Sequence, residues 1–145
     1  VLAYSRTQHP EGAQIAQYVS LDTLLAQSDV ISLHCPLTPE TEMLINAETI
    51  AKMRDGAMLI NTARGGLIDE DALAFALGTG KLSGFAADVV SREPIAPLNP
   101  LLTAPNCILT PHMAWAPTES RQRIIDCTVQ NIQSFLDGLP INTVN

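Results

Sequence analysis

Arg64, Glu93 and His112 have side chains that could act together on a small organic acid. The guanidinium of Arg64 can hold a carboxylate through two parallel hydrogen bonds, and the two glycines after it allow close approach of a ligand. His112 can carry a proton near neutral pH, and Glu93 could bond its other ring nitrogen and favour the protonated form. These groups suit reduction of a 2-oxo acid, in which Arg64 would hold the substrate, His112 would give the proton and a cofactor would give hydride.

Each of these residues also has an ordinary structural interpretation. A single arginine after a strand is usually a surface charge, and the Arg-Gly-Gly run at Arg64 also fits a simple turn. Asp88 and Glu93 fit caps, and His112 fits a loop histidine with satisfied hydrogen bonds. The hypothesis of a site therefore depends on all of these residues following strands.

Apolar runs of strand length alternate with helical patterns along the chain. The predicted strands are 1–5, 29–35, 56–62, 82–89 and 107–110. The predicted helices are 21–28, 47–53 with Asn46 as N-cap, 69–77 with Asp69 as N-cap, and a long helix from Pro117 to a stop at Gly138. This alternation predicts an α/β fold, a Rossmann-like doubly wound parallel sheet. Strands without polar alternation predict that the sheet is covered on both faces.

Ligands of doubly wound sheets bind beyond the carboxyl ends of the strands. Four predicted strands end in unusual residues, which are His34-Cys35-Pro36, Thr62-Ala63-Arg64, Asp88 and Thr110-Pro111-His112. We therefore expect these residues to face one crevice. Asp88 could accept a hydrogen bond there from the carboxamide of a nicotinamide.

The composition limits the class of protein. The chain has 145 residues, of which 46% are hydrophobic and 16% charged, so one globular domain is expected. A net charge of −7 disfavours binding to nucleic acid, and no apolar run reaches the roughly 18 residues of a membrane span. Three cysteines without a CxxC pair predict reduced thiols in a cytoplasmic protein. The sequence has no cluster of cysteine and histidine residues, so no metal site is expected.

The segment 61–69, NTARGGLID, closely resembles the signature of the D-isomer-specific 2-hydroxyacid dehydrogenases. Other pieces follow in the order of that family, namely His34-Cys35-Pro36-Leu37 with Thr41, Asp88-Val89 with Glu93-Pro94, and Thr110-Pro111-His112. The resemblance covers essentially the whole chain.

This resemblance implies that Arg64, Glu93 and His112 are the catalytic residues. Arg64 would orient the substrate, His112 would be the acid in reduction and the base in oxidation, and Glu93 would pair with His112. Further positions match residues that line the dinucleotide in the family; with Arg64 and His112 they are Cys35, Pro36, Thr41, Thr62, Ala63, Asp88 and Ala114.

Two closing segments resemble the glycerate dehydrogenase, or hydroxypyruvate reductase, branch of the family. They are 112–116, HMAWA, and 139–145, LPINTVN. The implied substrate is hydroxypyruvate or glyoxylate, while D-lactate-type and phosphoglycerate-type substrates stay open. Trp115 lies either near the substrate or dimer interface, or in a core or between domains. The family also implies a homodimer.

The chain departs from the family at its start. The glycine-rich GxGxxG turn that cradles the pyrophosphate is absent, together with the first strand before it and a preceding substrate domain. We therefore expect 1–116 to be a dinucleotide-binding domain incomplete at its N-terminus. We expect 117–145 to be an interdomain helix and tail that return to the substrate domain, and the chain alone to turn over little.

Ser5 and Arg6 end the first predicted strand, where an acidic residue would favour NAD. Arg6 could pair with a 2′-phosphate, and no carboxylate in the sequence pattern opposes one. This favours NADP, or the use of both cofactors, unless Arg6 is only a solvated loop charge.

Two other functions stay open. A dinucleotide-sensing corepressor can resemble this family and keep its catalytic residues, although the sequence has no partner-docking motif or disordered tail. The chain could also be an inactive fragment of the enzyme.

Overall fold

The computed structural model describes residues 1–144, and Asn145 of the expected tail lies outside the described residues. Contacts divide the chain into two compact units. The N-terminal unit is Val1–Pro111, and the C-terminal unit begins at His112.

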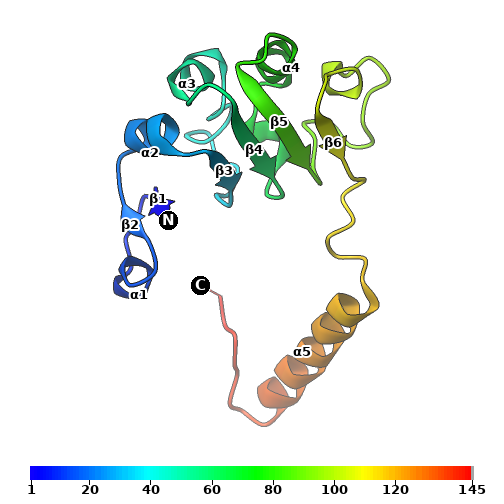
Figure 1. Cartoon of the computed structure of the whole chain (residues 1–145). Helices are drawn as coiled ribbons and strands as arrows, with labels where there is room; N and C mark the ends of the chain where they lie inside the picture. The colour runs from blue at the N-terminus through cyan, green and yellow to red at the C-terminus, as the bar shows by residue number, and fades with distance from the viewer. Residues whose placement is uncertain (145) are drawn as a thin grey trace. The chain divides into compact units, whose positions relative to one another are not determined.

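A parallel sheet of four strands forms the centre of the N-terminal unit (Figure 1). Its order is β3 (Val30–Leu33), β4 (Ala57–Asn61), β5 (Leu82–Ala87) and β6 (Cys107–Leu109). Successive strands are neighbours and run parallel, so each connection crosses over one face of the sheet. The predicted parallel sheet is confirmed, and each observed strand is shorter than its predicted apolar run.

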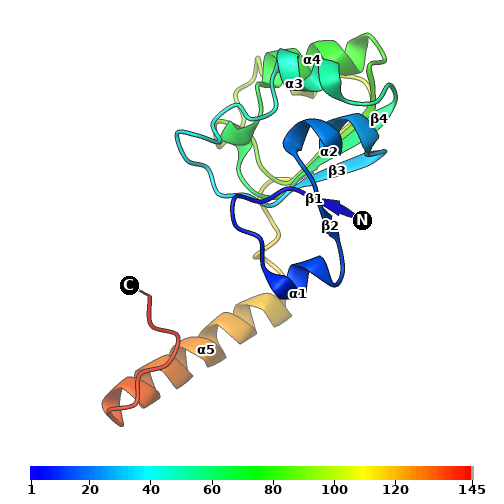
Figure 2. The same ribbon diagram turned by 90° about the vertical axis from the view of Figure 1, so that its left-hand side faces the viewer.

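The crossover helices are α2 (Leu21–Gln27), α3 (Ala47–Lys52) and α4 (Glu70–Gly78), with two 3-10 turns, η1 (Gly65–Leu67) and η2 (Pro100–Leu102). The side chains of Asn46 and Asp69 accept hydrogen bonds from the first free backbone amides of α3 and α4, as predicted. Ser20 caps α2 in the same way. Figure 2 shows α3 and α4 side by side against one face of the sheet.

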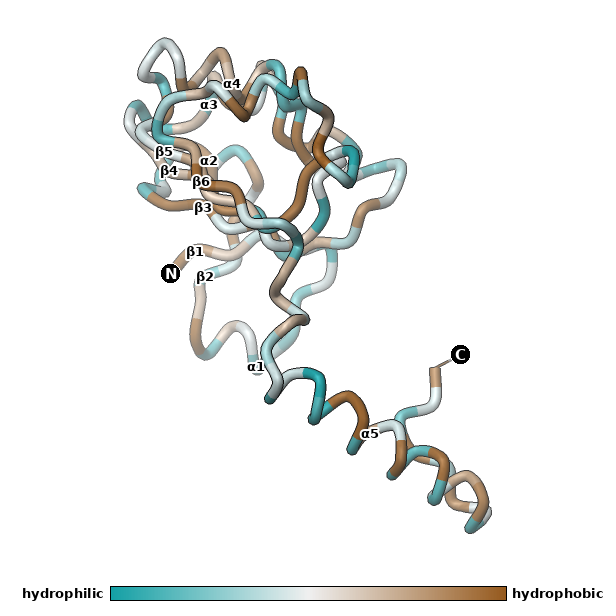
Figure 3. Tube along the Cα trace, turned by 90° about the vertical axis from the view of Figure 1, so that its right-hand side faces the viewer, coloured by the Kyte–Doolittle hydropathy of each residue, from teal (hydrophilic) through white to brown (hydrophobic). Residues whose placement is uncertain are grey.

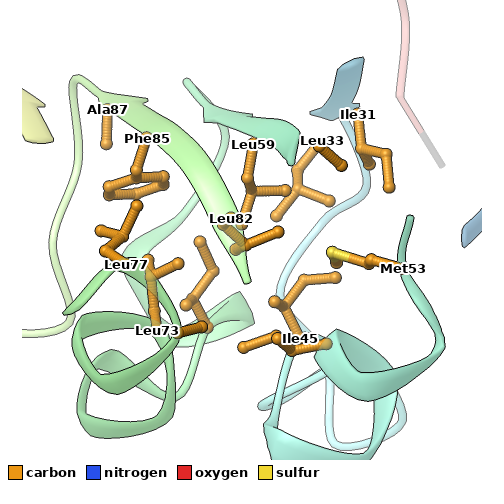
Figure 4. Packing of buried hydrophobic residues seen from close by; sticks show 14 of the residues in the cluster. Ile31, Leu33, Ile45, Met53, Leu59, Leu73, Leu77, Leu82, Phe85 and Ala87 are labelled. Carbon is orange, nitrogen blue, oxygen red and sulfur yellow. The ribbon is translucent and has the colours of Figure 1, made fainter. Parts of the chain in front are cut away.

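The core lies between the sheet and these helices. Leu59 and Leu82 from the strands pack against Leu73 of α4, and all three are fully buried (Figure 4). Burial of each such side chain contributes about 1.5–3 kcal/mol. Alternate residues of β3 and β4 face this core, which fixes their register. β5 has a register shift near its start and contributes Leu82, Phe85 and Ala87 to the core.

The opposite face of the sheet is exposed within Val1–Pro111. Val30 is 47% exposed, Met58 is 46% exposed and Ile108 is 67% exposed. The expectation of a sheet covered on both faces therefore holds for one face only among these residues. Continuous apolar strands place apolar side chains on both faces of the sheet, but the described helices cover only one of these faces.

A second, two-stranded sheet stands beside β3. It pairs β1 (Leu2–Ala3) with β2 (Gln17–Tyr18) in parallel, and α1 (Pro10–Ala13) connects them. β1 lies near the outer edge of β3 in Figures 1 and 2, yet no hydrogen bonds join the two sheets. The sequence pattern predicted β1 over a longer range and did not predict α1 or β2, since two-residue strands carry no periodicity.

The C-terminal unit consists mainly of α5 (Thr118–Leu136). Pro117 is the N-cap of this helix and not its first residue as predicted, so the helix begins one residue later. Gly138 ends it with a φ of 74°. Hydrophobic and hydrophilic residues alternate along the helix in Figure 3. The predicted apolar row is real, and all its members are exposed: Ile124, Ile125, Val129, Ile132, Phe135 and Leu136. None of the helices described is long and apolar enough to cross a membrane.

Candidate active site

The carboxyl ends of β4, β5 and β6 are tied together by hydrogen bonds. The backbone amide of Asp88, directly after β5, donates to the carbonyl of Asn61 at 3.1 Å. The Thr110 hydroxyl donates to the Asp88 carboxylate, and the Thr110 amide donates to the carbonyl of Ala87. Asp88 is 7% exposed. The predicted convergence of these three strand ends at one edge of the sheet is thus present in the structure.

Asn61 shapes the turn that carries Arg64. Its side chain is fully buried at the end of β4, where its oxygen accepts from the amide of Ala63 at 3.0 Å. Its amide group donates to the carbonyl of Arg64 at 2.9 Å. The guanidinium of Arg64 donates to the Ala63 carbonyl at 2.7 Å and lies at the surface beside the exposed Thr62. The backbone of Arg64 is therefore fixed while its charge stays accessible.

Gly65 and Gly66 bring two other loops against this turn. A Cβ on Gly65 would overlap the backbone of Val90 and the amide nitrogen of Ser91. A Cβ on Gly66 would lie 2.9 Å from the side chain of Leu37, a softer obstacle. The close approach that the two glycines allow is therefore used by the protein's own chain, and their close approach to a ligand stays a prediction.

Glu93 lies on the loop that Gly65 touches. Its carboxylate accepts from the backbone amide of Val90 at 3.3 Å, so the loop closes on itself. Arg64 and Glu93 thus belong to two segments that are in direct backbone contact at Gly65 and Val90.

The segment Cys35–Thr41 follows β3. The Thr41 hydroxyl donates to the carbonyl of Pro36 at 2.7 Å and accepts from the amide of Thr38 at 2.8 Å. Cys35 packs against the core. The structure therefore gives Pro36 and Thr41 one compact loop, and their contact with a dinucleotide stays a prediction.

His112 is the first residue of the C-terminal unit. Its φ of 50° lies in the left-handed region, which residues other than glycine adopt rarely and which is enriched at functional sites. Ala114 and Trp115 follow it, and Trp115 is exposed. The pairing of Glu93 with His112, and the places of Ala114 and Trp115 beside ligands, stay predictions.

Ser5 and Arg6 are exposed and follow β1. The hydrogen bond from the Thr38 side chain is the largest of several causes that lower the pKa of Glu40, and the charge of Arg6 is a smaller one. A carboxylate therefore lies within electrostatic range of Arg6. Glu40 is 34 residues away in the sequence, so only the fold brings it into this range, and the selection of NADP by Arg6 stays a prediction.

Two further findings concern metals and thiols. Among residues 1–144, no group of three or more histidine, cysteine and acidic side chains is arranged to hold a metal ion. Cys35, Cys107 and Cys127 are free thiols, and burial raises the pKa of Cys107.

The comparison with known families decides the relationship. The D-isomer specific 2-hydroxyacid dehydrogenase NAD binding domain matches residues 1–114. The chain belongs to this family. A hydroxypyruvate reductase of Blautia hydrogenotrophica is 54% identical, covering 100% of this chain and 45% of that protein. A glycerate dehydrogenase of Methylorubrum extorquens is 52% identical, covering 87% of this chain and 41% of that protein.

Solved structures agree with this dehydrogenase family. An acyclic imino acid reductase in complex with NADPH and D-Arg has a TM-score of 0.87 and 32% identity, covering 100% of this chain and 46% of that one. The predicted resemblance and the Rossmann-like fold are therefore confirmed, and the chain is a nicotinamide-dinucleotide-binding domain. It spans less than half the length of the curated relatives that it matches.

Three residues of this dehydrogenase domain were not predicted to matter for the site. In the sequence, Asn61 stands out only as part of the signature, Gly65 only as a residue that lets a ligand approach, and Glu70 not at all. The structure shows that all three hold the site loops. For Asn61 a signal existed, since a polar residue that ends an apolar strand needs buried hydrogen-bond partners.

Replacement of Gly65 by alanine tests the backbone contact. Gly65→Ala should lower the free energy of unfolding by about 1–3 kcal/mol because the new methyl group has no space. Chemical denaturation measures this change. Gly78→Ala is the matched control, since nothing lies within 4 Å of its Cβ, and it should be neutral or stabilising by about 0.4–1 kcal/mol. Equal effects of the two substitutions would contradict the contact.

Proposed function

We propose that the complete protein is an oxidoreductase that transfers a hydride between NAD(P)H and a small 2-oxo acid, hydroxypyruvate or glyoxylate, to give the D-2-hydroxy acid. Membership of the family and the two relatives named above support the reaction class. The observation that carries the proposal is the Arg64 turn, whose backbone is fixed by buried Asn61 while its guanidinium is exposed at the carboxyl edge of the sheet.

Arg64 binds the substrate in this proposal. A guanidinium is permanently charged and presents paired donors that match a carboxylate. Its position directly after β4 is where ligands of doubly wound sheets bind. Arg64 would therefore hold the acid with its carbonyl group turned to the reacting centre.

The residues at the edge of the sheet fit a nicotinamide dinucleotide. Asp88 is a buried carboxylate that is held by Thr110, and a carboxylate is an acceptor that suits the N–H groups of a carboxamide. Thr62 and Ala63 add backbone groups and small side chains beside it, and Cys35, Pro36 and Thr41 would line the same molecule. The bound dinucleotide supplies the hydride.

His112 handles the proton. One ring nitrogen would donate a proton to the carbonyl oxygen of the substrate as hydride reaches the carbonyl carbon, and the reverse reaction would return it. Glu93 would accept a hydrogen bond from the other ring nitrogen and stabilise the charged imidazolium. The left-handed backbone of His112 supports a positioned role.

Steady-state kinetics test this function with the product of the complete gene, hydroxypyruvate or glyoxylate, and NADPH or NADH. His112→Ala should lower kcat by about a hundredfold to ten-thousandfold because proton transfer is lost. Arg64→Ala should mainly raise KM for the acid. Arg54→Ala is the control, since Arg54 forms a surface ion pair with Asp29, and it should change neither constant.

Absence of turnover by the unmodified protein with both acids and both cofactors would reject the enzyme. In that case a dinucleotide-sensing role becomes the better hypothesis, and binding of NADH without turnover would support it.

Arg6 is the basis for proposing that the protein prefers NADP to NAD, or uses both cofactors. Arg6 is exposed after β1 and could pair with a 2′-phosphate, with Glu40 as its competitor. A carboxylate at position 5 would repel that phosphate.

Three variants of the complete protein test this choice. Arg6→Ala and Ser5→Asp should each lower kcat/KM for NADPH by about tenfold or more relative to NADH, as expected when a phosphate contact of about 1.4 kcal/mol is lost. Glu40→Gln should raise the preference for NADPH because the competing charge is removed. An unchanged ratio of the two cofactors in Ser5→Asp would show that this end of β1 does not select the cofactor.

The proposal for domain organisation extends beyond this chain. A doubly wound sheet has the strand order 3-2-1-4-5-6. The order β2-β1, one further parallel strand and then β3-β4-β5 would match it, with β6 as a seventh strand at the edge. We therefore propose that 1–116 is completed by a preceding strand and glycine-rich turn. The segment 117–145 would pack against the substrate domain of a homodimeric protein, and the free thiols support a cytoplasmic location.

Amide hydrogen exchange along α5 tests the organisation. In the complete protein, α5 should be protected at least about tenfold more than in the 145-residue chain because its apolar row becomes covered. Amides of α4 are the internal reference, because their helix already packs on the sheet. Equal protection of α5 in both proteins would contradict the proposed packing, and sedimentation of the complete protein would show whether it is a dimer.

A further inference from the structure

Glu70 makes three hydrogen bonds to the segment that carries Glu93. One carboxylate oxygen accepts from the backbone amide of Ser91 at 2.7 Å. The other accepts from the Ser91 hydroxyl at 2.7 Å and from the side-chain amide of Asn99 at 2.8 Å. Asn99 is buried, and its own oxygen caps η2 through the amide of Leu101. Glu70 therefore connects the start of α4 to both ends of the segment 91–99.

Two neighbouring backbone amides of this loop donate to two different carboxylates. The amide of Val90 donates to Glu93, and the next amide, that of Ser91, donates to Glu70. The backbone of Val90 and Ser91 also packs against Gly65. The loop is thus held by Glu70 from one side and by the close contact with Gly65 from the other, just before the chain reaches Glu93.

Asp88 has a separate anchor. Its backbone is held by Asn61 and its carboxylate by Thr110. The hydrogen bonds of Glu70 act beyond this anchor, on the part of the loop that leads to Glu93. Loss of Glu70 should therefore move Glu93 and leave Asp88 in place.

We propose that Glu70 is a positioning residue that fixes the carboxylate of Glu93 for its action on His112. This inference rests on the proposed function, since it gives Glu93 its partner role in proton transfer. Glu70 would act through this loop and not on the substrate or the cofactor. Charge-assisted hydrogen bonds are the stronger class, and a displacement of about 1 Å can cost about a hundredfold in rate.

The test uses the complete protein with hydroxypyruvate and the preferred cofactor. Glu70→Ala should lower kcat by between about tenfold and about a hundredfold, while KM for the cofactor stays within about twofold. Glu70→Gln keeps one acceptor oxygen and should retain part of the activity. Ser91→Ala should lower kcat by about two- to tenfold. Asp71→Ala, an exposed acid on the same helical turn, is the control and should leave kcat unchanged.

A double-mutant cycle with Glu93 separates positioning from general stability. In a Glu93→Gln background, Glu70→Ala should lower kcat by less than about twofold, because the carboxylate that Glu70 positions is already lost. An additive cycle, with the same loss in both backgrounds, overturns the inference. So does a loss in Glu70→Ala that appears mainly in KM for the cofactor.

Hydrogen exchange of the Ser91 amide gives a readout independent of turnover. In the unmodified protein without substrate the amide should be protected, and in Glu70→Ala it should exchange at least about tenfold faster. Unchanged exchange overturns the anchoring itself. If the unmodified protein shows no turnover but Ser91 loses protection, the proposed function fails while the anchor is confirmed.

Discussion

The contact between Gly65 and the backbone of Val90 and Ser91 is the constraint that the site depends on. It joins the turn after β4 to the loop after β5 without an intervening side chain. On the other side of the turn, Gly66 meets Leu37, and its carbonyl accepts a hydrogen bond from the amide of Met43. Three loops that leave three neighbouring strands are therefore packed together by two residues that lack side chains. Backbone packed on backbone is stiff, and stiffness is what the proposed site requires.

Polar groups at this edge are buried and satisfied, so they add rigidity at little cost. The side chain of Asn61 bonds to the turn after its own strand, and its carbonyl accepts from the amide of Asp88. The carboxylate of Asp88 accepts from Thr110 at the next strand end. Within the described residues, every buried side-chain nitrogen and oxygen has a hydrogen-bond partner. A network of this kind fixes one arrangement, because any displacement would leave a buried group unpaired. Arg64 and Glu93 then stand on a frame that is set by β4 and β5.

Two apolar surfaces are exposed among the described residues. One face of the central sheet and the apolar row of α5 are both open in the two units. Isolated apolar residues are common on surfaces, whereas a whole helix face of them marks an interface. The family match to residues 1–114 stops before α5, and the chain spans less than half of its relatives. These facts together support the proposed packing of 117–145 on a part of the protein outside this chain.

The sequence by itself determined the kind and order of most elements. The helical period and the caps Asn46 and Asp69 located α3 and α4, and the run of apolar strands gave the parallel sheet, because such patterns are local and repeat within a few residues. The signature at 61–69 and the polar strand ends gave the family and one edge of the site. The four-residue helix α1 and the two-residue strand β2 were not predicted, since they are too short to carry a pattern.

The tertiary structure alone decided which loops touch. Glu70 finds Ser91 21 residues later, Arg6 comes within the electrostatic range of Glu40, and Gly65 meets Val90. Each of these pairs joins segments that are distant in the chain. Their meeting depends on the register of neighbouring strands and on the crossover between them. An acidic residue at a helix start has the same local pattern whether it faces water or holds a loop, so the pattern could not distinguish the two.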